Sequence, residues 1–113
     1  FRGQAVVEAT VTEMVKRHGL GTTPGVQEVF IFAGGSAGAR GAMVHLDYIQ
    51  DMLTSAGATH HVTVLGFLDS PMWLNLKPLK GNSFVGFAGT TSGVYKQANV
   101  SHFGDGCAAK YEN

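Results

Sequence analysis

Apolar residues form two kinds of pattern along the first seventy positions of the chain, a stripe with helical spacing and runs without alternation. A stripe with helical spacing predicts an amphipathic helix over residues 4–18, with basic residues in its last turn and Gly19 as the residue that ends it. The members of the stripe are Val7, Val11, Met14 and Val15. The largely apolar run over residues 26–33 does not alternate, so we expect it to be a strand buried on both faces.

A second helix is expected over residues 37–54 and a second apolar strand over residues 62–68. The apolar side of this helix consists of Ala42, Leu46, Ile49 and Leu53. A strand, a helix and a further strand in this order are typical of a parallel pair and therefore of an α/β fold. Beyond Asp69 the periodicity of the apolar residues weakens. We expect residues 70–93 to form an ordered loop region over the edge of the sheet at which the two strands end.

Composition narrows the classes of function. Eight basic and eight acidic residues give no net charge, so the electrostatic footprint of a nucleic-acid-binding or membrane-surface protein is absent. No apolar segment is long enough to span a bilayer. Sixteen glycines, several at junctions between expected helices and strands, suit α/β architecture. Cys107 is the single cysteine, which excludes a disulfide within the chain but not one to a partner outside it.

The junction after the first strand carries the candidate chemistry. Gly34-Gly35-Ser36-Ala37-Gly38 reads G-x-S-x-G between a strand and a helix, which is the setting of a nucleophile elbow. We expect side chains at Gly34 and Gly38 to collide with the neighbouring backbone, and Ser36 to present its hydroxyl at the carboxyl end of the strand. The backbone N–H of Ala37 would then face a developing oxyanion.

None of the histidines is a convincing general base for Ser36. His18 ends the first helix, and His45 lies more than about 10 Å along the second at ~1.5 Å per residue. His60 and His61 precede the second strand at the opposite edge of the sheet, and neighbours in a strand point to opposite faces, which disfavours a metal pair. No metal or cofactor is expected.

Two further residues are candidates near the serine. Asp69 ends the second strand at the same edge as Ser36, where it either shapes the neighbouring loop or is the acid of a triad. Trp73 either lines an acyl or sugar pocket or packs a loop onto the sheet. His102 is a weak candidate for the base, and Asn99-Val100-Ser101 is a glycosylation sequon consistent with secretion.

Two other interpretations of the glycine-rich junction stay open. A phosphate-binding or other non-catalytic binding loop is disfavoured, because Ser36 breaks the G-x-G-x-x-G register and no Lys-Ser/Thr pair completes a P-loop. A patatin-like acyl hydrolase would pair Ser36 with an aspartate in a Ser-Asp dyad. Asp105-Gly106 fits that pattern loosely, but the stretch over residues 66–74 has no place in it.

With these residues located, nearly the whole chain resembles the pectin acetylesterase family, which includes plant pectin acetylesterases and the carboxylesterase Notum. Gly35-Ser36-Ala37-Gly38, followed by His45-Leu46-Asp47, is similar to the family's nucleophile segment. The stretch G-F-L-D-S-P-M-W-L over residues 66–74 is similar to G-x-x-D-S-G-W-F-x-D. Departures from the family pattern are Gly35 in place of Cys or Ser, Ala39-Arg40 in place of glycine, and Pro71 in place of glycine.

The resemblance implies the fold and a division of roles. The chain would be an interior fragment, residues 1–113, of one α/β-hydrolase-like domain: a three-layer sandwich with a parallel sheet and a strand–nucleophile elbow–helix unit. Ser36 would be the nucleophile and Ala37 an oxyanion-hole donor, with Asp69 shaping the site. The family's triad Asp and His lie after the region covered, and Cys107 resembles a family cysteine that pairs with a later one.

The same resemblance implies an activity, a partner and a location. The expected protein is a secreted or cell-wall serine carboxylesterase that hydrolyses an acyl, chiefly acetyl, oxygen ester of a pectin-like polysaccharide, while relatives also act on lipidated protein. With its triad incomplete, the 113-residue chain alone is expected to have little or no esterase activity. Turnover that disappears in Ser36→Ala would instead place the base within the chain.

Overall fold

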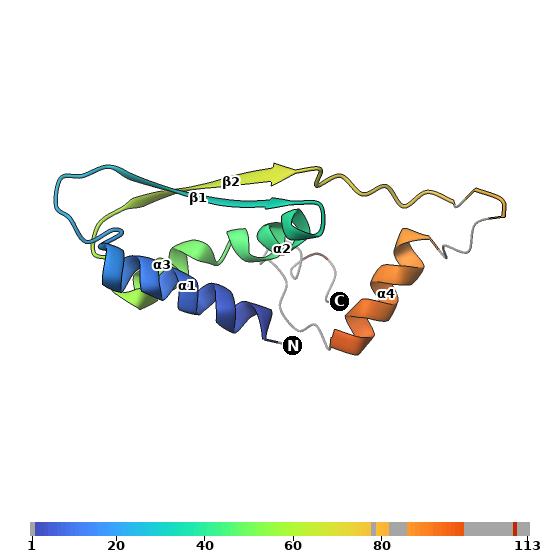
Figure 1. The fold of residues 1–113 in the computed structure, drawn as a ribbon, viewed down its shortest axis with the longest axis horizontal. Coiled ribbons are helices and arrows are strands. Elements are labelled where there is room, and N and C mark those ends of the chain that lie inside the picture. The colour runs from blue at the N-terminus through green and yellow to red at the C-terminus, as the bar shows by residue number, and fades with distance from the viewer. Residues whose placement is uncertain (1, 78, 82–85, 99–109, 111–113) are drawn as a thin grey trace. The chain divides into compact units, whose positions relative to one another are not determined.

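The computed structural model describes residues 2–77, 79–81, 86–98 and 110, in two compact units, Phe1–Pro71 and Met72–Asn113. Among the described residues, the first unit contains two strands and three helices, and the second contains one helix (Figure 1). In chain order the elements are α1 (Gly3–His18), β1 (Glu28–Gly35), α2 (Ala37–Leu46), α3 (Ile49–Ala56), β2 (Val62–Asp69) and α4 (Phe87–Ala98).

The two strands pair in parallel, as the strand–helix–strand order predicts. The register runs without a break from Glu28 opposite Val62 to Gly35 opposite Asp69, so both strands end at the same edge of the sheet. β1 begins and ends two residues later than expected, because the ladder extends through Gly34 and Gly35 to their partners on β2. The described chain is therefore an α/β structure with the carboxyl ends of its two strands side by side.

A small apolar core lies between the sheet and the helices of the first unit, which all cover one face of it (Figure 1). The buried apolar side chains are Val11, Val15, Ala39, Ala42, Ile49, Leu53, Ala56 and Val62. The stripe expected on the first helix is thus confirmed at its two buried valines. The helix ends as predicted at Gly19, whose φ of 74° is left-handed and whose N–H donates to the Val15 carbonyl at 3.1 Å.

The prediction that the first strand is buried on both faces is wrong for the described residues. Burial alternates along β1, and Phe30 and Phe32 lie on the covered face with their ring centroids 6.3 Å apart. The physical reason is that the described helices cover one face alone, whereas the strands are apolar on both. On the other face, which we call the open face, four apolar side chains are at least half exposed: Val29, Ile31, Leu65 and Phe67.

The open face leads to a prediction about this chain in solution. An exposed apolar patch binds hydrophobic dyes, so Leu65→Thr together with Phe67→Thr is expected to lower the fluorescence of bound ANS to roughly half. Threonine is β-branched and suits a strand, so the far-ultraviolet spectrum should be preserved. Val64→Thr, on the covered face, is the matched control and should destabilise the fold instead. Unchanged dye binding in the double variant would show that another surface binds the dye.

The single helix expected over residues 37–54 is two helices. Its predicted apolar side is confirmed, since Ala42, Ile49 and Leu53 are buried. However, the chain tightens between α2 and α3, where the Tyr48 N–H donates to the His45 carbonyl three residues back at 2.9 Å. Such a tight turn starts a new helix axis without proline or glycine, so the sequence pattern did not show it.

The loop expected over residues 70–93 is interrupted by α4. The N–H of Ala88, in the first turn of this helix, donates to Oδ1 of Asn75 at 3.2 Å. Trp73 stacks on Phe87 within the same unit, with ring centroids 6.4 Å apart and ring planes 10° from parallel. A distant asparagine therefore supplies the capping acceptor that a local N-cap residue usually provides, which hid the start of the helix from sequence reasoning.

Candidate active site

Ser36 makes the whole connection between β1 and α2. The strand ends at Gly35 and the helix begins at Ala37. The backbone of Ser36 has φ 51° and ψ −117°, close to the first central position of a type II′ turn, which glycine normally occupies. A side chain in this region strains the backbone, and such strain is concentrated at functional sites. The serine is exposed.

Backbone hydrogen bonds hold this turn from both sides. The Ser36 N–H donates to the carbonyl of Asp69 on β2 at 3.0 Å. The Ser36 carbonyl accepts from the N–H groups of Ala39 at 3.1 Å and Arg40 at 3.4 Å. The sheet thus fixes the amide side of the serine and the helix fixes its carbonyl side, which leaves the hydroxyl as the group free to react.

The glycines around Ser36 have different roles. A Cβ on Gly34 would overlap the carbonyl of Gly38 and lie 2.7 Å from the N atom of Ala39, so the crowding expected at Gly34 is present. At Gly38 the expectation is wrong, because a Cβ there would meet nothing within 4 Å in the described structure. At Gly35 a Cβ would meet Oδ2 of Asp69 at 3.9 Å, an ordinary contact. The strand, rather than the helix, therefore needs the glycine.

Ala37 is the first residue of α2, so its N–H belongs to the four amides that have no partner inside the helix. These amides and the helix dipole favour negative charge near the start of a helix. The position suits a donor to an oxyanion, and that role remains a prediction.

Asp69 and Ser70 lie at the same edge of the sheet as Ser36. Asp69 is the last residue of β2 and is exposed. The Ser70 hydroxyl donates to its Oδ1 at 3.1 Å, and Ser70 has a left-handed φ of 56°. Sequence reasoning missed Ser70, because a residue before proline is expected to be extended.

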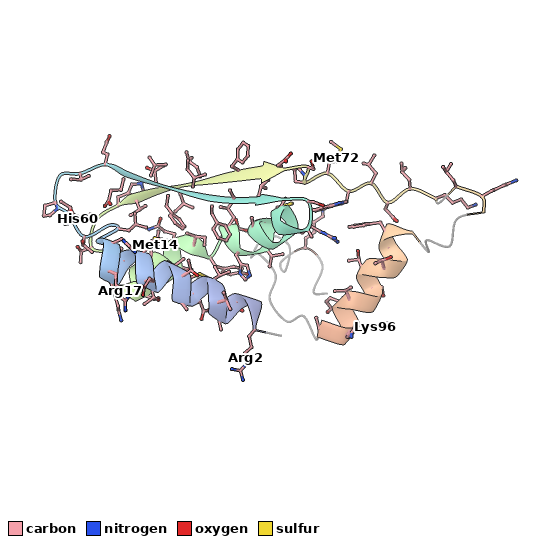
Figure 2. The ribbon with its side chains drawn as sticks, in the orientation of Figure 1. Arg2, Met14, Arg17, His60, Met72 and Lys96 are labelled. Carbon is pink, nitrogen blue, oxygen red and sulfur yellow. The ribbon has the colours of Figure 1, made fainter. Side chains whose placement is uncertain are left out.

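The described histidines do not reach Ser36. His60 lies before β2, at the edge of the sheet opposite Ser36 (Figure 2), and His61 follows it. His18 ends α1, and His45 lies in the last turn of α2, at the far end of the helix that Ser36 begins. His102, Asp105, Gly106, Cys107 and the sequon over residues 99–101 lie outside the described residues.

Other features of the described chain do not meet at this turn. A hollow of about 410 Å³ between α1 and α3 is lined by Glu8, Tyr48 and Asp51 among others, and Ser36 is not part of it. Within the described ranges no three metal-binding side chains come close enough to hold an ion. Trp73 is half-buried and belongs to the second unit, where it stacks on Phe87.

The fold defines the class of this protein as α/β, with a strained serine at the carboxyl edge of a parallel strand pair. The family model of the pectinacetylesterases matches residues 1–111, so the chain belongs to the pectinacetylesterase family, a family of carboxylic-ester hydrolases. Comparisons with curated proteins and with solved structures returned no match.

Proposed function

We propose that the protein is a serine carboxylesterase that removes acetyl groups from a pectin-like polysaccharide, with Ser36 as its nucleophile. The observation that carries the proposal is the backbone of Ser36, a non-glycine residue at φ 51° that forms a one-residue turn from strand to helix. A nucleophile elbow needs such a turn to expose its serine. Membership of an ester-hydrolase family supports the same chemistry.

The proposed reaction has two half-reactions. In the first, a general base takes the proton of Ser36 as Oγ attacks the ester carbonyl carbon, and the N–H of Ala37 stabilises the oxyanion. The carbon–oxygen bond to the sugar then breaks, and the proton passes to the departing hydroxyl. In the second, water is deprotonated by the same base and attacks the acyl-Ser36, which releases acetate and restores the serine. The base is a histidine outside the described residues, since those described lie away from Ser36.

The proposed place of action is the cell exterior or the cell wall, where an acetylated polysaccharide is found. None of the described helices is long and apolar enough to cross a membrane. The proposed partner is an acylated polysaccharide, and the family membership is the support for it.

A fluorophosphonate probe tests this proposal in the full-length protein that carries this sequence. Because such probes phosphonylate activated serines, we expect one adduct, located on the Ser36 peptide by tandem mass spectrometry. Acetylated pectin in excess should slow the labelling, and the protein should release acetate from that polymer.

Two variants make the labelling experiment decisive. Ser36→Ala should abolish the adduct, whereas Ser55→Ala, which alters an exposed serine within α3, should leave it unchanged. An adduct that persists in Ser36→Ala, or one that forms on a different serine, would contradict the proposal.

A further inference from the structure

The edge of the sheet that carries Ser36 holds a second serine whose φ is also positive. Gly35 and Asp69 are register partners, so Ser36 and Ser70 are the next residues on the neighbouring strands. Among the described residues, they are the two non-glycine positions with positive φ, at 51° and 56°. Each follows the last residue of its strand, so the two strained turns begin side by side.

The conformation of Ser70 needs something to hold it. Left-handed backbone is unfavourable for a residue with a side chain, and Pro71 favours an extended residue before it. The hydroxyl of Ser70 supplies a local restraint, because it donates to Oδ1 of Asp69 at 3.1 Å. Glycine would adopt this backbone without strain but would lack that donor.

Asp69 connects this restraint to Ser36. Its carbonyl accepts the Ser36 N–H at 3.0 Å, while its side chain accepts the Ser70 hydroxyl. Its other carboxylate oxygen, Oδ2, lies 3.9 Å from the place that a Cβ on Gly35 would take, directly before Ser36. One residue therefore contacts both strained turns, one through its side chain and the other through its backbone.

We infer that Ser70 and Asp69 are positioning residues that together hold Ser36 in place. We call this pair the clamp. The Ser70 hydroxyl fixes the Asp69 side chain, which fixes the turn after β2 and with it the carbonyl that binds the Ser36 amide. Asp69 acts as a hydrogen-bond acceptor and not through its charge. The clamp rests on the proposed function for its effect on catalysis, while its effect on the Ser36 backbone stands by itself.

Four variants in the full-length protein separate the parts of the clamp. Ser70→Ala removes the donor and keeps the strain, whereas Ser70→Gly removes the donor and relieves the strain. Asp69→Ala removes the side-chain acceptor, and Asp69→Asn keeps an acceptor oxygen without the charge. Ser55→Ala again serves as a matched control on α3.

Amide hydrogen exchange of Ser36 is the first measurement. Loss of one exposed hydrogen bond is expected to raise its exchange rate about fivefold in Ser70→Ala, Ser70→Gly and Asp69→Ala. Asp69→Asn should stay within about twofold of the parent, because its amide oxygen still accepts from Ser70. Unchanged exchange in both Ser70 variants overturns the clamp, and Asp69→Asn behaving like Asp69→Ala overturns the acceptor role.

Acetyl-ester kinetics are the second measurement. The same three variants should lose about fivefold in kcat with KM unchanged, and Asp69→Asn should be spared. Ser70→Gly should melt at a higher temperature than the parent, so its loss of kcat cannot come from unfolding. If the parent protein neither hydrolysed acetyl esters nor reacted at Ser36, the proposed function would be wrong. The amide hydrogen exchange of Ser36 would still show whether the clamp holds the Ser36 backbone.

Discussion

The Gly34→Ala variant is expected to lose about 3 kcal/mol of stability, at the upper end of what overpacking by one methyl group costs. The new Cβ would overlap the carbonyl of Gly38 and crowd the N atom of Ala39. Both obstacles are backbone atoms, so no rotamer change relieves them, and the start of α2 must move away from β1. Chemical denaturation measures the loss.

The same substitution should lower kcat/KM by about a hundredfold even where the protein remains folded, because a shift of about 1 Å in a positioned group costs that much. Ser36 stands between the strand and the helix that would separate, so both its hydroxyl and the N–H of Ala37 would be displaced. Esterase assays at a temperature well below the melting point separate this effect from unfolding.

Two other glycines provide matched controls. A Cβ on Gly66 would meet Cδ2 of Leu46 at 2.7 Å, the far end of a flexible side chain, so Gly66→Ala should cost less than about 1 kcal/mol. Gly38 is helical with open space around it, so Gly38→Ala should stabilise by about 0.5–1 kcal/mol. If Gly34→Ala were no worse than Gly66→Ala, close packing of strand on helix would not explain the glycine.

Local sequence patterns predicted the elements whose cause is local. The first helix and its glycine stop at Gly19 follow from periodicity and stop signals that act within a few residues. The parallel pairing of the strands follows from the rule for a strand–helix–strand connection. The open face of the sheet did not follow. An apolar strand has the same kind of sequence whether or not a layer of structure covers its second face. The exposure of Val29 and Ile31 could therefore not be derived from their identity.

In the candidate site, too, one feature could be predicted from the sequence and another could not. Ser36 was found because G-x-S-x-G between a strand and a helix is a recognisable pattern, although close packing explains Gly34 and not Gly38. Ser70 was missed because its left-handed backbone contradicts the preference of a residue before proline, and the hydroxyl contact with Asp69 has no signature in the sequence. Positions where the observed backbone departs from the preference of the local sequence are the ones at which a functional role should be tested first.

Ser36 itself gives the largest expected effect on activity. Replacing the proposed nucleophile should lower kcat by at least about a thousandfold in both Ser36→Gly and Ser36→Ala, since the remaining groups of such sites retain only a small part of the rate enhancement. The two variants should differ in stability. Glycine accepts φ 51° and ψ −117° freely, whereas alanine keeps the strain of a Cβ in this region.

Ser36→Gly is therefore expected to be about 1 kcal/mol more stable than the parent, after allowing for the greater backbone entropy of glycine in the unfolded chain. Ser36→Ala should match the parent. Denaturant midpoints measured alongside acetate release would show activity lost as stability rises, the behaviour of a strained residue kept for its chemistry. If Ser36→Gly were instead less stable than Ser36→Ala, the turn would not be strained. The backbone conformation of Ser36 would then no longer support its proposed role as the nucleophile.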